Sequence, residues 1–115
     1  MEKAKALRKL LERPGVILAA GAHDAISAKL IEKAGFEVIW ASGFAISAAH
    51  LGMPDAGLLT MVENLEIVKR INDAVSIPVI ADGDDGYGNA INVMRTVAEF
   101  EGAGVAGICL EDNLF

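Results

Sequence analysis

The sequence predicts an α/β domain built on a parallel sheet, and three observations support this prediction. Segments with helical hydrophobic spacing alternate along the chain with short runs of apolar residues. Those runs are continuous instead of alternating with polar residues, which is typical of parallel strands in a sheet covered on both faces. The 115 residues suffice for one domain but not for a complete eight-stranded α/β barrel, which takes about 250 residues. We therefore expect a single domain over residues 1–115.

The first half of the chain is expected to form a helix, a strand, a second helix and a second strand. Residues 2–13 carry one stripe of leucines at helical spacing and stop at a proline-glycine pair, so they should form the N-terminal helix. The apolar run 16–20 indicates a buried strand. Asp24 is a suitable cap for a helix that runs to Ala34, and residues 38–41 should form the second strand.

The second half repeats this alternation. Thr60 and Glu63 form a capping-box pattern that opens a helix, and residues 78–81 should form a strand, because proline is tolerated at a strand's first position. A helix over 89–101 and a strand over 106–110 follow. The N-terminal helix is thus followed by four parallel strands and three helices. The helix residues expected to face the core are Ile26, Leu30, Ile31, Ala34, Val62, Leu65, Val68, Ile71, Val75, Val93, Val97 and Phe100.

Polar or small residues follow the carboxyl end of every predicted strand, whereas the opposite ends look like ordinary connections. In parallel α/β folds the chemistry lies just beyond the carboxyl ends of the strands. This asymmetry predicts a functional site at that edge of the sheet. The residues concerned are His23-Asp24, Ser42-Gly43, Asp82-Gly83-Asp84 and Glu111-Asp112.

Acidic residues at these strand ends predict a divalent-metal site. Asp82 and Asp84 are two apart, so their side chains point the same way if the strand conformation persists. Glu111 ends the next strand, and Asp55 can reach the same place from a loop. Unneutralised carboxylates in one place repel each other, and a hard cation such as Mg²⁺ relieves that repulsion. The alternative is that Asp82, Asp84 and Asp85 only form a turn before a helix.

The segment Ser42-Gly43-Phe44 predicts a binding site for an oxygen anion. Its glycine lets a ligand approach the backbone closely, and successive amides there can bind a carboxylate or enolate oxygen. The alternative is a tight turn that needs glycine. His23 and His50 are expected to pack or face solvent, and Cys109 is expected to be a small core residue.

The charge and cysteine content exclude several classes of partner and location. The net charge is −6, and an acidic protein is repelled by nucleic acids and by anionic membranes, so neither is an expected partner. The single cysteine cannot form an intramolecular disulfide, which favours a reducing compartment. No apolar run reaches the roughly 18 residues of a membrane span, and no secretory signal is apparent. A soluble, cytoplasmic protein is the expectation.

Four motifs occur together in this chain. They are S-G-x after the second strand, P-D-x-G-L-L-T in the following loop, D-x-D-x-G-Y-G-N after the third strand and L-E-D at the fourth. They lie in the stretches PGVILAAGAHDAISAKLIEKAGFEVIWASGFAISAAHLGMPDAGLLT, IPVIADGDDGYGNAINV and GVAGICLEDNLF. With this combination, the chain resembles the isocitrate lyase/phosphoenolpyruvate mutase superfamily from about Leu7 onward.

The resemblance implies a fold, a cofactor and a kind of assembly. The family fold is a TIM-type (β/α)8 barrel with an extra N-terminal helix, and this chain would be its N-terminal half. Family members exchange a C-terminal helix between subunits, which implies a homo-oligomer. They act on small carboxylates or phosphonates and use Mg²⁺, or Mn²⁺, to hold an enolate-like intermediate.

The resemblance also implies roles for individual residues. Asp82 would be the closest metal ligand, and Asp84, Glu111 and Asp55 would hold the metal largely through waters. Asp55 and Glu111 would be the catalytic residues. The remaining three residues, which would cradle the substrate's carboxylate and oxyanion, are Ser42, Gly43 and Phe44.

Three functions stay open because the chain departs from the family pattern. Family lyases carry a Lys-x-Cys-Gly-His segment shortly after the L-E-D strand, and this sequence ends at Phe115 before it. The first hypothesis is a 2-methylisocitrate lyase-like enzyme that cleaves a C–C bond in a small 2-hydroxy or 2-oxo acid. The second is a phosphonomutase acting on the P–C bond of a phosphonopyruvate-type substrate. The third is an inactive half-barrel that self-associates.

Overall fold

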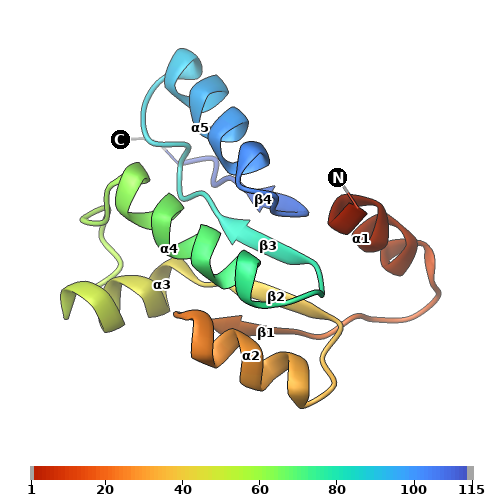
Figure 1. Ribbon diagram of the computed structural model, residues 1–115. Coiled ribbons are helices and arrows are strands. Elements are labelled where there is room, and N and C mark those ends of the chain that lie inside the picture. Colours follow the sequence, from red (N-terminus) through yellow and green to blue (C-terminus); the bar gives the residue numbers. More distant parts are fainter. Residues whose placement is uncertain (1, 114–115) are drawn as a thin grey trace.

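Four parallel strands form one sheet in the order β1-β2-β3-β4, as the sequence predicts (Figure 1). The structure is a computed structural model that describes residues 2–113. The alignment of β3 with β4 pairs Asp82 with Cys109, so the carboxyl ends of these two strands lie at the same level. The strands are β1 Ala19–Ala22, β2 Val38–Ala41, β3 Val79–Asp82 and β4 Gly107–Cys109.

Helices connect the strands and cover one face of the sheet. Helices α2, α4 and α5 lie beside one another on that face (Figure 1). The expected caps are present: Asp24 accepts a hydrogen bond from the Ser27 amide, and Thr60 with Glu63 forms the capping box of α4. The helices are α1 Glu2–Glu12, α2 Ala25–Lys33, α3 Gly43–Ile46, α4 Met61–Ala74 and α5 Ala90–Gly102, with a π-helix η1 over Ser47–Leu51.

The region after β2 and the ends of the outer strands differ from the expectation. Helix α3 and the π-helix η1 form where the sequence suggested only a connection rich in glycine, serine and alanine. β1 starts later than expected, at Ala19, and the preceding Val16 and Leu18 are exposed. Cys109 is exposed too, not a core residue. Val16, Leu18 and Cys109 belong to or adjoin β1 and β4, which each pair with one strand in residues 2–113, so less of the molecule covers them.

The core lies between the sheet and α2, α4 and α5. Phe100, Ile71 and Val68 are fully buried there, as expected from their helical spacing. Five of the residues expected to face the core are exposed, so these predictions are wrong. They are Ile26 (62%), Leu30 (61%), Val62 (64%), Val97 (37%) and Ala34. Helix α2 instead buries Ala28. Hydrophobic spacing identifies an apolar stripe, but which stripe touches the sheet depends on how closely the helix can approach it.

Helix α1 is attached at the amino-terminal edge of the sheet by Lys3. The Lys3 ammonium donates hydrogen bonds to the backbone oxygens of Asn72 (2.6 Å) and Val75 (2.8 Å), which lie at the C-terminal end of α4. The Asn72 amide in turn donates to the Ala103 carbonyl at 3.1 Å. Burial lowers the pKa of Lys3, against the raising effect of nearby acids. One side chain therefore caps α4 and anchors α1, away from the polar strand ends.

Replacing Lys3 with methionine is expected to lower the free energy of unfolding by about 1–3 kcal/mol, because two carbonyl groups lose a charged donor. Urea denaturation measures this change. Lys5→Met is the control, since Lys5 is an exposed residue of the same helix. Equal effects of the two substitutions would show that the Lys3 bonds contribute nothing.

Within residues 2–113, no helix combines the length and the apolar character needed to cross a membrane.

Candidate metal centre at the carboxyl ends of β3 and β4

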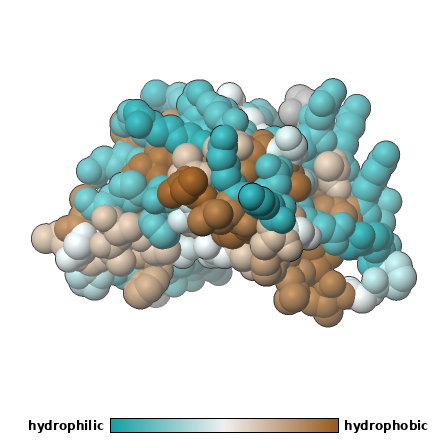
Figure 2. Space-filling view, turned by 60° about the horizontal axis from the view of Figure 1, so that its bottom comes forward, coloured by the Kyte–Doolittle hydropathy of each residue, from teal (hydrophilic) through white to brown (hydrophobic). Residues whose placement is uncertain are grey.

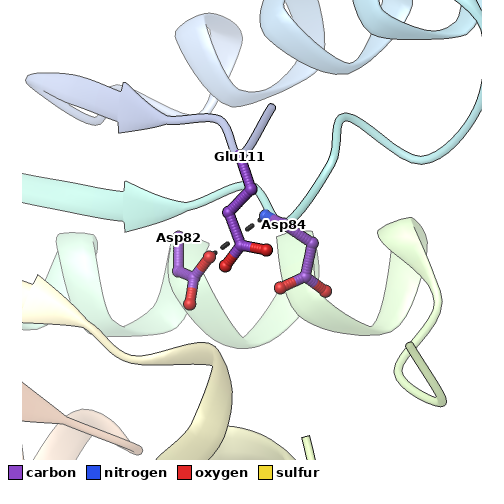
Figure 3. A group of neighbouring side chains, drawn as sticks. All are labelled: Asp82, Asp84 and Glu111. Carbon is purple, nitrogen blue, oxygen red and sulfur yellow. Dashed lines mark hydrogen bonds between the residues drawn. The ribbon is translucent and has the colours of Figure 1, made fainter. Parts of the chain in front are cut away.

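Three carboxylates converge where β3 and β4 end. Asp82 is the last residue of β3, Asp84 follows in the loop, and Glu111 comes two residues after β4. One carboxylate oxygen of each residue lies within 4.8 Å of those of the other two. Figure 3 shows the three side chains gathered in one place from two neighbouring segments. The structure therefore brings together three of the four acids that were predicted as metal ligands.

Asp82 is the most firmly held member of this group. Asp82 is only 8% exposed, and each of its carboxylate oxygens accepts a hydrogen bond from one backbone N–H. Oδ2 accepts from the Gly43 amide at the start of α3, and Oδ1 accepts from the Asp84 amide, both at 3.0 Å. These bonds link β3 to the segment after β2 and leave the remaining lone pairs of both oxygens for another partner.

Asp84 carries an unfavourable charge in this position. Burial first, and then the neighbouring charges of Asp82, Asp55, Glu111 and Asp85 in that order, raise the pKa of Asp84 to about 6. The backbone of Asp84 has φ 48°, a left-handed conformation in which aspartate is one of the better-tolerated residues. Its carbonyl oxygen accepts the Glu111 amide at 2.6 Å, which ties the two loops together.

Two buried polar residues of the helices hold the loop after β3. The Thr96 hydroxyl of α5 donates to the Gly86 carbonyl at 2.9 Å, and Asn64 of α4 donates to the Asp82 carbonyl at 2.9 Å. Sequence analysis did not identify Asn64 or Thr96. The available signal was a polar side chain on the inward stripe of a helix, which has to find a partner when buried.

A cavity of about 690 Å³ opens beside the carboxylates. Its wall includes Asp84 and Glu111 and also Asp55, which arrives from the long segment between β2 and β3. Asp55 lies outside the group of three converging oxygens, although its charge still acts on Asp84. Asp82 is not part of this wall, so Asp84 and Glu111 connect the buried carboxylate to the open space.

The segment Ser42-Gly43-Phe44 lies beside the carboxylates but uses its polar groups internally. The Ser42 hydroxyl oxygen accepts the Ala45 amide at 3.2 Å and caps α3, and the Gly43 amide is the donor to Asp82. Phe44 is 64% exposed. A β-carbon at Gly43 would lie 2.5 Å from Asp82 Oδ2, so glycine is required by this close approach. Substrate binding by the three residues stays a prediction.

Neither histidine belongs to the carboxylate group. The His50 ring nitrogen Nε2 donates to the His23 carbonyl oxygen at 2.8 Å, which joins η1 to the end of β1. The His23 ring lies 3.4 Å from both the Ser27 hydroxyl and the Asp24 carboxylate. Both side chains thus have local partners, in agreement with their expected structural roles.

The donor set fits a hard divalent cation. All three groups offer oxygen, and their combined negative charge is what a Mg²⁺ site requires. The raised pKa of Asp84 shows that protein groups alone do not compensate this charge.

Comparison with known proteins places the chain in a family of enzymes. Residues 7–114 match the family described as phosphoenolpyruvate phosphomutase. The chain is 51% identical over 114 residues to 2,3-dimethylmalate lyase of Eubacterium barkeri. These residues make up 99% of this chain and 39% of that enzyme. The chain is 46% identical over 115 residues to phosphonopyruvate hydrolase of Variovorax sp., again covering 39% of the relative.

Solved structures of the family show the same fold. Phosphoenolpyruvate phosphomutase from Streptomyces platensis subsp. rosaceus superposes with a TM-score of 0.93 at 49% identity, over 97% of this chain and 39% of that one. Phosphonopyruvate hydrolase in complex with oxalate and Mg²⁺ gives a TM-score of 0.95 at 46% identity, over 100% and 40%. The chain thus spans about 39% of the length of these relatives, and the α/β half-barrel prediction is confirmed. It belongs to the phosphoenolpyruvate phosphomutase family, within the isocitrate lyase/phosphoenolpyruvate mutase superfamily.

Proposed function

We propose that this chain provides the metal site of a Mg²⁺-dependent lyase that cleaves a C–C bond in a small 2-hydroxy or 2-oxo carboxylic acid. The observation that carries the proposal is the convergence of Asp82, Asp84 and Glu111 next to a cavity of about 690 Å³. The 51% identity to 2,3-dimethylmalate lyase supports a lyase of the 2-methylisocitrate lyase kind. Mn²⁺ is the alternative metal, since it takes the same oxygen ligands.

The proposed roles follow from burial and from position around the cavity. Asp82 is the innermost ligand, because two backbone amides hold its carboxylate in place. Asp84, Glu111 and Asp55 hold the metal largely through waters, and Asp55 and Glu111 act as catalytic residues from the cavity wall. When bound, the cation stabilises negative charge on an enolate-like oxygen of the substrate.

Binding of the substrate's carboxylate and oxyanion is proposed for the start of α3. Ser42, Gly43 and Phe44 lie next to Asp82, and the amides of a helix start attract anions. The Gly43 amide now donates to Asp82. The proposal therefore requires this amide to be shared between the Asp82 carboxylate and the substrate's anion.

A phosphonomutase is the second candidate, acting on the P–C bond of a phosphonopyruvate-type substrate. The observation that favours it is the 46% identity to phosphonopyruvate hydrolase and 45% to the chloroplastic carboxyvinyl-carboxyphosphonate phosphorylmutase of Arabidopsis thaliana. These values are close to that of the lyase, and the same three carboxylates serve a metal that binds either a carboxylate or a phosphonate.

An inactive, self-associating half-barrel is the third candidate. Strands β1 and β4 each pair on one side only within residues 2–113, and open parallel edges favour pairing with another chain. Figure 2 brings forward the side with β1 and α2 and shows hydrophobic patches between hydrophilic ones. The exposed apolar residues of this part of the chain include Val16, Leu18, Ile26 and Leu30. A homo-oligomer is proposed in all three cases.

The test combines metal binding, turnover and mass. Isothermal titration with Mg²⁺ is compared between the wild-type chain, Asp82→Asn and the control Asp73→Asn, an exposed acid of α4 paired with Lys69. Turnover is measured on 2-methylisocitrate, 2,3-dimethylmalate, oxaloacetate and phosphonopyruvate, and sedimentation gives the oligomeric state. We expect saturable binding that Asp82→Asn alone removes. Absence of Mg²⁺ binding would overturn the metal site; binding without turnover would favour the half-barrel, and a monodisperse monomer would contradict self-association.

Magnesium affinity is expected to depend on pH through Asp84. Its pKa of about 6 means that a proton competes with the metal below that pH. The apparent affinity should fall about four-fold from pH 7.5 to 5.5, as expected for competition by one proton at that pKa. The stability of the metal-free chain should change with pH in the opposite direction. A raised carboxyl pKa means that protonated Asp84 favours the native state, so its contribution to the free energy of unfolding is lost as pH rises through about 6. Mg²⁺ titrations and urea denaturation between pH 5.5 and 7.5 measure the two trends. An Mg²⁺ affinity that does not change with pH would contradict the role of Asp84 as a metal ligand.

A further inference from the structure

Asn64 is a buried polar residue behind the metal centre that has no role in the function proposed above. It lies on α4 and is 1% exposed. Its Nδ2 donates to two oxygens, the Asp82 carbonyl and the Tyr87 hydroxyl, both at 2.9 Å. Its Oδ1 is buried without a hydrogen-bond partner in the described part of the chain. A buried acceptor of this kind costs about 1–3 kcal/mol, so the two donated bonds must set the orientation of the amide.

The Asp82 carbonyl determines which way the Asn64 amide faces. A carbonyl oxygen can only accept, so Asn64 has to present its NH₂ group to it. The reversed amide would place Oδ1 against the Asp82 carbonyl oxygen, and two acceptors would then face each other. Tyr87 is therefore the acceptor in its bond with Asn64, and its own hydroxyl hydrogen has to point elsewhere.

The Asn64 amide joins the Tyr87 hydroxyl to the Asp82 carbonyl, and the loop between these two residues carries Asp84. Tyr87 and Asp84 lie together in the wall of the cavity. Burial raises the pKa of Tyr87, and the charge of the neighbouring Asp84 carboxylate raises it further. The Tyr87 backbone is itself fixed, since its amide donates to Asp85 Oδ1 at 2.9 Å. Tyr87 is thus held at its hydroxyl by Asn64 and at its backbone amide by Asp85.

We propose that Asn64 is a positioning residue of the metal centre. Its amide joins the Asp82 carbonyl to the Tyr87 hydroxyl and so fixes the loop that holds the Asp84 carboxylate beside Asp82. This inference rests on the proposed function, because Mg²⁺ is the ligand that needs both carboxylates in place. A residue that orients a metal ligand from behind typically changes metal affinity by about 10- to 100-fold when removed.

The test is a double-mutant cycle read out as the Mg²⁺ dissociation constant. Tyr87→Phe removes only the hydroxyl, and Asn64→Leu removes the amide that orients it. Each substitution is expected to weaken Mg²⁺ binding by about 10-fold. The double variant should be no weaker than Asn64→Leu alone, whereas independent effects would multiply to about 100-fold. Tyr87 is the single tyrosine of the chain, so its near-ultraviolet absorption should also change with Mg²⁺ in the wild type.

Asn72→Leu is the matched control, since Asn72 is a buried asparagine of the same helix at the far end from the cavity. It should lower stability to urea but leave Mg²⁺ affinity unchanged. If Asn72→Leu weakens Mg²⁺ binding as much as Asn64→Leu, or if Tyr87→Phe binds Mg²⁺ like the wild type, this inference alone is overturned. Tyr87→Phe carries the test even if Asn64→Leu does not fold. A wild-type chain that binds no Mg²⁺ overturns the proposed function and this inference with it.

Discussion

Replacing Gly43 with alanine is expected to weaken Mg²⁺ binding by about 100-fold while the chain stays folded. The new β-carbon would lie 2.5 Å from Oδ2 and 3.0 Å from Cγ of Asp82. Real side chains do not tolerate such distances, so the Asp82 carboxylate has to leave its place. The backbone of Gly43 needs no positive φ and begins a helix, so alanine suits it locally. The loss would therefore come from the displaced carboxylate.

Gly102→Ala is the control for this substitution. Gly102 is the last residue of α5, and a β-carbon there would meet no atom within 4 Å. We expect unchanged Mg²⁺ affinity and a stability that is equal or higher by up to about 1 kcal/mol, the difference in helix propensity. Isothermal titration and urea denaturation measure the two quantities. Wild-type Mg²⁺ affinity in Gly43→Ala would mean that the metal does not depend on the observed position of Asp82.

Replacing Asp84 with asparagine is expected to stabilise the metal-free chain and at the same time to remove most of its Mg²⁺ affinity. The raised pKa shows that the charged form of Asp84 is unfavourable in the native state, through burial first and the neighbouring acids second. Asparagine removes that charge and is equally suited to φ 48°. We expect a gain of roughly 0.5–1 kcal/mol in the free energy of unfolding, a value discounted for the partial solvent exposure of this carboxylate.

Opposite signs with and without metal are the signature of this variant. Thermal unfolding in EDTA should give a higher midpoint for Asp84→Asn than for the wild type, and saturating Mg²⁺ should reverse the order, because only the wild type gains binding energy. Asp73→Asn should lose a few tenths of a kcal/mol with its surface ion pair and respond to Mg²⁺ like the wild type. A lower midpoint for Asp84→Asn in EDTA would show that the charge is compensated in a way that the structure does not contain.

A higher midpoint for Asp84→Asn in EDTA would show that particular groups at the carboxylate site lower the stability of the metal-free chain. Asp84 is charged where charge is unfavourable, and Asn64 carries a buried oxygen without a partner in residues 2–113. Both residues lie at the carboxyl ends of the strands. At the opposite edge, Lys3 and Asn72 satisfy the end of α4 with matched hydrogen bonds. The sheet thus has one edge where polar groups are matched by hydrogen bonds and one edge where charges and polar atoms lack full compensation, and the latter is the edge at which sites occur in α/β folds.

Local pattern was sufficient for the four strands, for the four longer helices and for most of the acidic site, but not for α3 and η1. The capping residues Asp24 and Thr60 marked the starts of two helices, because a side-chain cap acts on the next turn of its own chain. Asp82 and Asp84 were found in the same way, since residues at the end of one strand share an edge whatever the rest of the fold does. Roles in substrate binding and catalysis stay predictions until they are measured.

Tertiary packing decided what depends on contacts between distant segments. It placed Asp55 in the cavity wall but outside the group of converging oxygens, and it turned Cys109 to the surface. It also explains why residue 43 is glycine, since the Asp82 carboxylate, 39 positions away in the chain, lies against its backbone. The amino-acid sequence alone determined a parallel α/β half-barrel with acids at the strand ends. Only the structure shows which atoms meet at these strand ends, because contacts between side chains of separate elements depend on how closely the elements pack.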